Sequence, residues 1–206
     1  GLNSFGNTTI LEKIKSRDHT ENLLQKNTQV IKIKKKKKKN KIITLYGKKF
    51  LKPININVCG DPSSAAFFIA LTILVKGSSL KVKNVGLNPT RVGFLEILKK
   101  QKARIKVKNV KKRNNEFVGD IYVESCKLKP IHTPASIYPR TTDEYLILFI
   151  MAALTKGTST FKGIADLANK ESSRANEMKK ILFQIGIRCK LTSNEMKIYG
   201  KGIFDA

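Results

Sequence analysis

The chain has 206 residues, of which 41% are hydrophobic and 27% are charged. Lysine and arginine number 41 against 15 acidic residues, which gives a formal net charge of +26. The hydrophobic content is too high for a disordered basic tail, and no apolar run reaches the roughly 20 residues that a membrane-spanning helix needs. These values exclude a disordered or transmembrane chain and favour one or two compact domains with a core.

The three cysteines, Cys59, Cys126 and Cys189, lie far apart. Their odd number and wide spacing fit neither a disulfide framework nor a metal-ligand cluster, so we expect no metal site. The amino terminus also lacks the charged and then apolar pattern of a signal peptide. We therefore expect a cytoplasmic protein without a membrane partner.

The positive charge is mostly lysine, with 34 Lys and 7 Arg, and is densest at residues 34–39. A hairpin tip or a solvated loop explains this lysine run, and a phosphate-tracking patch for nucleic acid is the functional alternative. Because the run contains no aromatic residues and the chain carries no nucleic-acid-binding signature, we expect no specific nucleic-acid partner. The positive field would still favour a small anionic substrate.

Residues 1–57 resemble the end of a larger unit. A short strand lies within residues 2–14, a helix opens at residues 17–21, and alternating strands at 29–33 and 42–46 flank the lysine run. The chain begins without a methionine and the first half of this unit is missing. These features predict that the chain is a fragment.

An internal repeat follows, with copies at residues 58–125 and 126–206. Each copy has the order strand, apolar helix, strand, amphipathic helix, strand, strand. The first apolar helix is expected at 62–75 with Asp61 as its cap, and the second at 142–154. Both helices are apolar on every side and should therefore be buried, so several βαβαββ units must pack around them.

In the first copy, the amphipathic helix is expected at 90–100 and the strands at 80–85, 105–107 and 121–123. In the second copy, the amphipathic helix contains Met178, Ile181, Leu182 and Ile185, and the strands are expected at 160–164, 187–191 and 196–199.

Two local clusters lie at turns into helices. Residues 60–64, Gly-Asp-Pro-Ser-Ser, could bind a phosphate at a helix start, although a plain N-cap is the commoner use of such a sequence. Residues 88–91, Asn-Pro-Thr-Arg, form a turn in which Arg91 opposes the helix dipole. That unfavourable position hints at a function without defining one.

Two further clusters combine acids and bases. Asp143 and Glu144 begin a helix, where they either compensate its dipole or provide a proton acceptor at the mouth of a cleft. Lys170, Glu171 and Arg174 form either a solvated charged turn or an anion site in which the cations bind phosphate or carboxylate while Glu171 moves a proton. Local sequence leaves both alternatives open.

In order and spacing, these four clusters resemble motifs of the 5-enolpyruvylshikimate-3-phosphate synthase family. Residues 16–21, Ser-Arg-Asp-His-Thr-Glu, are similar to a motif of its glyphosate-insensitive bacterial branch. The resemblance covers nearly the whole chain and implies an α/β fold, the inside-out barrel of enolpyruvyl transferases, incomplete here. In this fold, residues 1–57 would end one lobe, and 58–125 and 126–206 would be two units of the other.

The resemblance implies transfer of the enolpyruvyl group of phosphoenolpyruvate to the 5-hydroxyl of shikimate 3-phosphate, with release of phosphate and no metal or organic cofactor. Asp143 would accept the hydroxyl proton, and Glu171 would exchange a proton with the methylene carbon. Lys170 and Arg174 would hold phosphoenolpyruvate.

The shikimate phosphate would be bound by Arg17 with Ser16 beside it. The chain departs from the family pattern at Ala168, Asn169 and Ser173, and it lacks the family's amino-terminal cation motifs. We therefore expect the 206 residues alone to be inactive and the full-length protein to be an active monomer in aromatic amino-acid biosynthesis.

Two alternatives stay open at this stage. The first is the sister enolpyruvyl transferase that acts on UDP-N-acetylglucosamine, whose members lack the Asn-Pro-Thr-Arg and Lys-Glu-Ser-x-x-Arg pairing. The second is a non-enzymatic basic module that binds nucleic acid or another polyanion, which only the net charge and the lysine run support.

Overall fold

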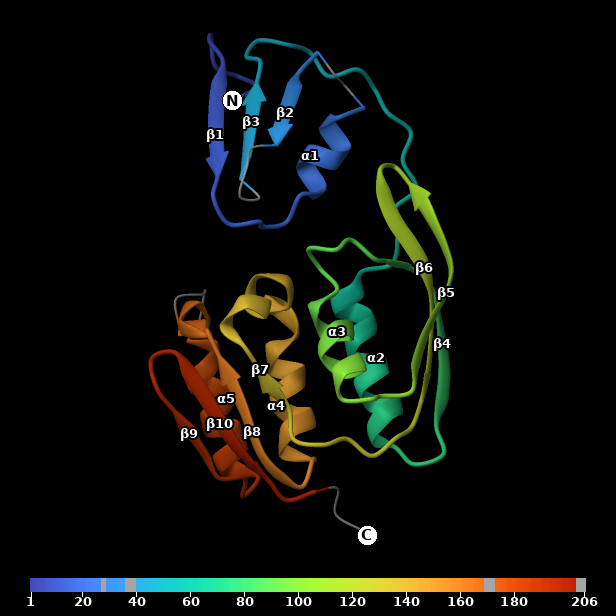
Figure 1. Ribbon diagram of the computed structural model, residues 1–206, viewed down its shortest axis with the longest axis vertical. Helices are drawn as coiled ribbons and strands as arrows, with labels where there is room; N and C mark the ends of the chain where they lie inside the picture. Colours follow the sequence, from blue (N-terminus) through green and yellow to red (C-terminus); the bar gives the residue numbers. More distant parts are fainter. Residues whose placement is uncertain (27–28, 36–39, 169–172, 203–206) are drawn as a thin grey trace.

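The computed structural model describes residues 1–26, 29–35, 40–168 and 173–202. Its amino-terminal sheet lies at one end of the molecule, and two further sheets with their helices lie at the other end (Figure 1). The α/β fold class expected from the sequence is confirmed, and no sheet in the described ranges closes into a barrel. No helix in these ranges is long and apolar enough to cross a bilayer.

The amino-terminal part is a three-stranded antiparallel sheet with one short helix. Its elements are β1 (Thr8–Glu12), α1 (His19–Leu24), β2 (Ile31–Lys35) and β3 (Lys41–Leu45), and the strand order is β1-β3-β2. The strands that flank the lysine run, β2 and β3, are direct antiparallel partners, with Lys35 opposite Lys41. Residues 36–39 of the run lie outside the described residues. This sheet has a small core of its own, made by Val30, Ile31 and Ile43.

The next two parts have the same topology. The first contains α2 (Pro62–Leu74), β4 (Ser79–Gly86), α3 (Gly93–Lys100), β5 (Ile105–Arg113) and β6 (Glu116–Glu124). The second contains β7 (His132–Thr133), α4 (Tyr145–Ala153), β8 (Gly157–Lys162), α5 (Arg174–Gln184), β9 (Cys189–Leu191) and β10 (Glu195–Gly200). In both parts the last strand lies between its two predecessors, in the orders β4-β6-β5 and β8-β10-β9. In both, a short segment before the first helix pairs in parallel with the following strand: Gly60 with Val85, and β7 with β8.

The repeated element order predicted from the sequence is thus present. The three sheets fall within residues 1–57, 58–125 and 126–206, and the division of the chain into units at these boundaries stays a prediction. The predicted helix at 90–100 begins only at Gly93, because the Asn88 side chain accepts hydrogen bonds from Thr90 and holds a turn there.

Helices α2 and α4 pack against each other between the sheet β4-β6-β5 and the sheet β7-β8-β10-β9 (Figure 1). Around α4 the core is aromatic: Phe149 meets Tyr145 and Phe161 edge to face at centroid distances of 5.9 and 4.9 Å. For α2, the prediction of burial on every side is wrong, because Phe67, Phe68 and Leu71 are 65%, 62% and 60% exposed. This helix packs against β4, β6 and α4, and the side chains of Phe67, Phe68 and Leu71 stay largely exposed among the described residues.

The amino-terminal part is attached to the rest through a buried amide. Asn88 is 2% exposed, and its Nδ2 donates to Asp18 Oδ1 at 2.7 Å and to Glu116 Oε1 at 3.2 Å. The same Glu116 oxygen lies 2.6 Å from His19 Nδ1. Asn88 therefore links the start of α1 to the β5–β6 hairpin, and this link sets where residues 16–18 lie.

The core packing can be tested with Phe149→Ala. Phe149 is fully buried, so its loss should lower the free energy of unfolding by about 3–5 kcal/mol through lost burial and the cavity left behind. Phe183→Ala is the matched control, because Phe183 is 81% exposed and its loss should cost less than about 0.5 kcal/mol. Urea denaturation of both variants checks this, and equal losses would contradict the packing described here.

The attachment can be tested with Asn88→Ala. Removing this amide leaves Asp18 and Glu116 without its two hydrogen bonds, which should cost about 1–3 kcal/mol of docking free energy. We expect faster amide hydrogen exchange in α1, with little change in α4. Asn7→Ala, at an exposed position, is the control. Equal exchange of α1 in the two variants would refute the linking role of Asn88.

Candidate functional site

Asp143 lies on a single helical turn, Thr142–Glu144, directly before α4. The turn is held by a hydrogen bond from Thr142 Oγ1 to Tyr138 O at 3.0 Å and one from Glu144 N to Thr141 O at 3.0 Å. The Asp143 side chain is 35% exposed, so a ligand in solvent can reach its carboxylate.

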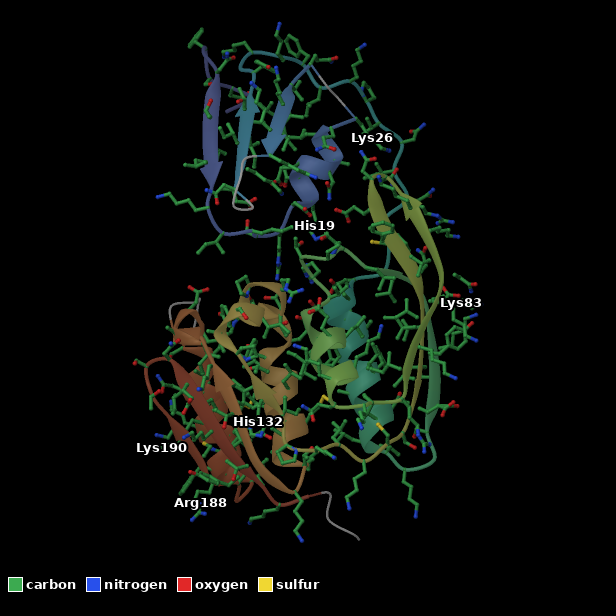
Figure 2. All side chains as sticks on the ribbon, in the orientation of Figure 1. His19, Lys26, Lys83, His132, Arg188 and Lys190 are labelled. Carbon is green, nitrogen blue, oxygen red and sulfur yellow. The ribbon has the colours of Figure 1, made fainter. Side chains whose placement is uncertain are left out.

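Two arginines from distant segments flank this carboxylate. Arg17 Nη2 donates to Asp143 Oδ2, although 126 residues separate the two in sequence. Arg174, the first residue of α5, places Nη1 3.9 Å from Asp143 Oδ1. Figure 2 shows His19, two residues after Arg17, between the amino-terminal sheet and the helices. The fold thus brings together three of the residues expected from the sequence.

Ser16 makes a local contact instead. Its backbone N and its Oγ both donate to Glu12 Oε1 at 3.0 Å. Burial raises the pKa of Glu12, but the Ser16 hydrogen bonds and the nearby Lys41 ammonium outweigh it, so the pKa lies below its usual value. The hydroxyl of Ser16 therefore fixes the end of β1, and its role toward a phosphate stays a prediction.

Lys170 and Glu171 lie outside the described residues. The structure describes the chain on either side of them, with a short helical turn at Ala165–Ala168 before and α5 after. Their expected contacts with a substrate therefore stay predictions.

Asp61 is the N-cap of α2, as the local sequence predicted. Its Oδ2 accepts from Ser64 N at 2.9 Å, and Pro62 takes the first helical position. What the sequence did not reveal is the partner of Arg91, whose Nη2 donates to Asp61 Oδ1 at 3.1 Å and to Ser63 Oγ at 2.6 Å. The only signal for this contact was the unfavourable position of Arg91 at a helix start.

The arrangement suits a small anionic ligand that also exchanges a proton. Guanidinium groups bind phosphate or carboxylate through parallel hydrogen bonds, and a carboxylate beside them can accept a proton from a bound hydroxyl. Within the part of the chain that the structure describes, no three His, Cys, Asp or Glu side chains come together as a metal site.

Comparison with known proteins gives this chemistry a context. The sequence profile of the family described as "EPSP synthase (3-phosphoshikimate 1-carboxyvinyltransferase)" matches residues 2–204. The 3-phosphoshikimate 1-carboxyvinyltransferase of Zymomonas mobilis is 41% identical over 187 residues, which are 91% of this chain and 41% of that protein. The Bacillus subtilis protein of the same name is 36% identical over 201 residues, or 98% of this chain and 46% of that protein.

Solved structures agree with these relatives. An EPSP synthase from Acinetobacter baumannii superposes with a TM-score of 0.84 at 37% identity, covering 98% of this chain and 44% of that one. The enolpyruvyl transferase NikO from Streptomyces tendae, at 14% identity and a TM-score of 0.64, shares the fold. The chain spans less than half the length of the curated relatives it matches. With a profile match over nearly all its residues, the chain belongs to the EPSP synthase family.

Proposed function

We propose that this chain supplies part of the active site of an enzyme that transfers the enolpyruvyl group of phosphoenolpyruvate to the 5-hydroxyl of shikimate 3-phosphate and releases phosphate. The observation that carries the proposal is the meeting of Arg17, Asp143 and Arg174 at one place. It supplies a proton acceptor between two anion-binding groups, which this reaction between two phosphorylated acids needs.

The proposed proton transfers involve two carboxylates. Asp143 takes the proton of the 5-hydroxyl while the oxygen of that hydroxyl forms a bond to C2 of phosphoenolpyruvate. Glu171 gives a proton to the methylene carbon, which becomes a methyl group, and a tetrahedral intermediate results. Glu171 then removes a methyl proton while the C2–O bond to phosphate breaks, so the double bond is restored and phosphate leaves.

The proposed binding roles belong to the basic residues. Arg17, with Ser16 beside it, binds the phosphate of shikimate 3-phosphate, and Lys170 and Arg174 hold phosphoenolpyruvate. The net charge of +26 would raise the rate at which such anions meet the site, an effect that salt should weaken.

Four further statements belong to the proposal. The family resemblance supports a monomeric full-length protein. The resemblance of residues 16–21 supports membership of the glyphosate-insensitive bacterial branch. Three partly exposed thiols are typical of a reducing compartment such as the cytoplasm. We propose no specific nucleic-acid partner, and retention on DNA that persists at high salt would refute this.

Activity can be tested in a chimera in which this chain replaces the matching segment of the Bacillus subtilis relative. We expect phosphate release from phosphoenolpyruvate with shikimate 3-phosphate, none with UDP-N-acetylglucosamine, and none from the 206 residues alone. In the chimera, Asp143→Asn and Glu171→Gln should each lower kcat by about 10²- to 10⁴-fold, because each removes a proton-transfer group.

Glu177→Gln is the control, because this exposed carboxylate on α5 pairs only with Lys180 among the contacts that the structure describes. Its kcat should stay close to that of the parent chimera. Turnover of Asp143→Asn or Glu171→Gln within a few-fold of the parent would show that the proton-transfer roles are wrong. A chimera that folds and binds neither substrate would contradict the proposed function as a whole.

A further inference from the structure

The side chains of Arg91, Ser63 and Glu144 meet next to Asp143, and the function proposed above gives none of them a role. Arg91 lies in the turn between β4 and α3, Ser63 in the first turn of α2, and Glu144 directly after Asp143. Arg91 was singled out in the sequence by its unfavourable position at a helix start. The structure gives this position a reason, since the guanidinium lies beside the carboxylates at the starts of α2 and α4.

Glu144 is the buried member of this cluster. Only 1% of its surface is exposed, and a carboxylate at such a depth is costly unless it is paired and hydrogen-bonded. Ser63 Oγ donates to Glu144 Oε1 at 2.5 Å and accepts from Arg91 Nη2 at 2.6 Å. Arg91 Nη2 itself lies 3.9 Å from Glu144 Oε1. The three groups therefore form a continuous chain, guanidinium to hydroxyl to carboxylate.

The charges around Glu144 oppose one another. Burial raises the pKa of Glu144, the Ser63 hydrogen bond and the Arg91 guanidinium lower it, and the neighbouring Asp143 charge raises it again, so that the pKa lies above its usual value. Asp61 shares Arg91 from the other side. Glu144 is thus coupled to Asp143 by charge as well as by the backbone of one short turn.

Two more contacts join α3 to the segment that leads into Asp143. A Cβ at Gly93 would overlap Thr141 Oγ1, so only glycine permits this close approach of the start of α3. One turn further on, Arg140 Nη1 donates to Glu96 Oε1 at 2.5 Å. The turn that carries Asp143 is therefore held from the β4–α3 side at several points.

We propose that Arg91 and Ser63 are positioning residues for Asp143 that act through Glu144. They hold the buried Glu144 carboxylate in place, and with it the turn that presents Asp143 to the two arginines. The proposal rests on the proposed function, because Asp143 must be the proton acceptor for its position to matter in catalysis. Neither Arg91 nor Ser63 needs to touch a substrate.

The pairing can be measured in the 206-residue chain itself by carbon-13 NMR titration of its carboxyl groups, with Glu144→Gln to assign the signal. In Arg91→Gln, the pKa of Glu144 should rise by at least about one unit, because an opposite charge within a few ångström is lost. Ser63→Ala should raise it by less, and Arg91→Lys, which keeps the charge, should restore part of the parent value.

Arg104→Gln is the matched control, since it removes one positive charge from an exposed position. It should leave the Glu144 titration unchanged, because exposed charges are screened by salt. If Arg91→Gln titrates like Arg104→Gln, the proposed pairing is overturned. Should Arg91→Gln fail to fold, Ser63→Ala decides, and a Glu144 pKa equal to that of the parent would overturn the proposal.

The consequence for Asp143 is measured in the chimera. Glu144→Gln removes a negative charge next to Asp143, so the acidic limb of the pH profile of kcat/KM should move to lower pH. A purely structural residue would lower kcat without moving this limb, and an unmoved limb overturns the positioning role. An inactive chimera would contradict the proposed function, whereas the titration of the chain alone would still decide whether Arg91 and Glu144 are paired.

Discussion

The site depends on α2, α4 and α5 all beginning on the side that faces the amino-terminal part of the chain. Figure 1 shows all three helices starting at the end that faces α1, and they pack in the order α2, α4, α5. The first turn of a helix has free N–H groups and a positive partial charge. Several such starts at one place favour carboxylates from the chain itself, such as Asp61 and Asp143, and anions from solvent. The attachment of the amino-terminal part through Asn88 then adds Arg17 to this end.

Local patterns were enough to predict the repeated element order. Asp61 and Pro62 start α2 through backbone chemistry that operates within four residues, and alternation of apolar side chains marks the strands. The burial of α2 could not be predicted in the same way. The apolar sequence of α2 shows only that the helix can be buried. Whether Phe67 and Leu71 are buried depends on which other elements pack against them. Burial by other elements depends on tertiary packing, which the sequence of one helix does not show.

For the candidate site as well, the motifs were predicted from the sequence, but the contacts between them depend on tertiary packing. The family resemblance singled out Arg17, Asp143 and Arg174, and the structure shows that these three meet. No spacing rule could join Arg17 to Asp143, since their contact requires the amino-terminal sheet to dock on the helices. The relation of Arg91 to Glu144 was hidden for another reason. Glu144 had an ordinary explanation at its own helix start, and Arg91 showed only an unfavourable position at its own. The contact between them depends on tertiary packing, which brings the β4–α3 turn to the start of α4.

The choice of cation at this end has a physical basis. The chain has 34 Lys and 7 Arg, yet four of the seven arginines, Arg17, Arg91, Arg140 and Arg174, form ion pairs in or next to the segments that meet at the start of α4, among the described residues. A guanidinium presents several fixed donors and is more weakly hydrated than an ammonium, so it can bridge two partners in a partly buried place. Arg91 does so with Asp61 and Ser63 through one nitrogen. Lysine would keep the charge at these positions but lose the geometry that relates one carboxylate to the next. Apart from specific contacts such as the one proposed for Lys170, the lysines supply a general positive field. The described groups around the start of α4 are aligned by arginines.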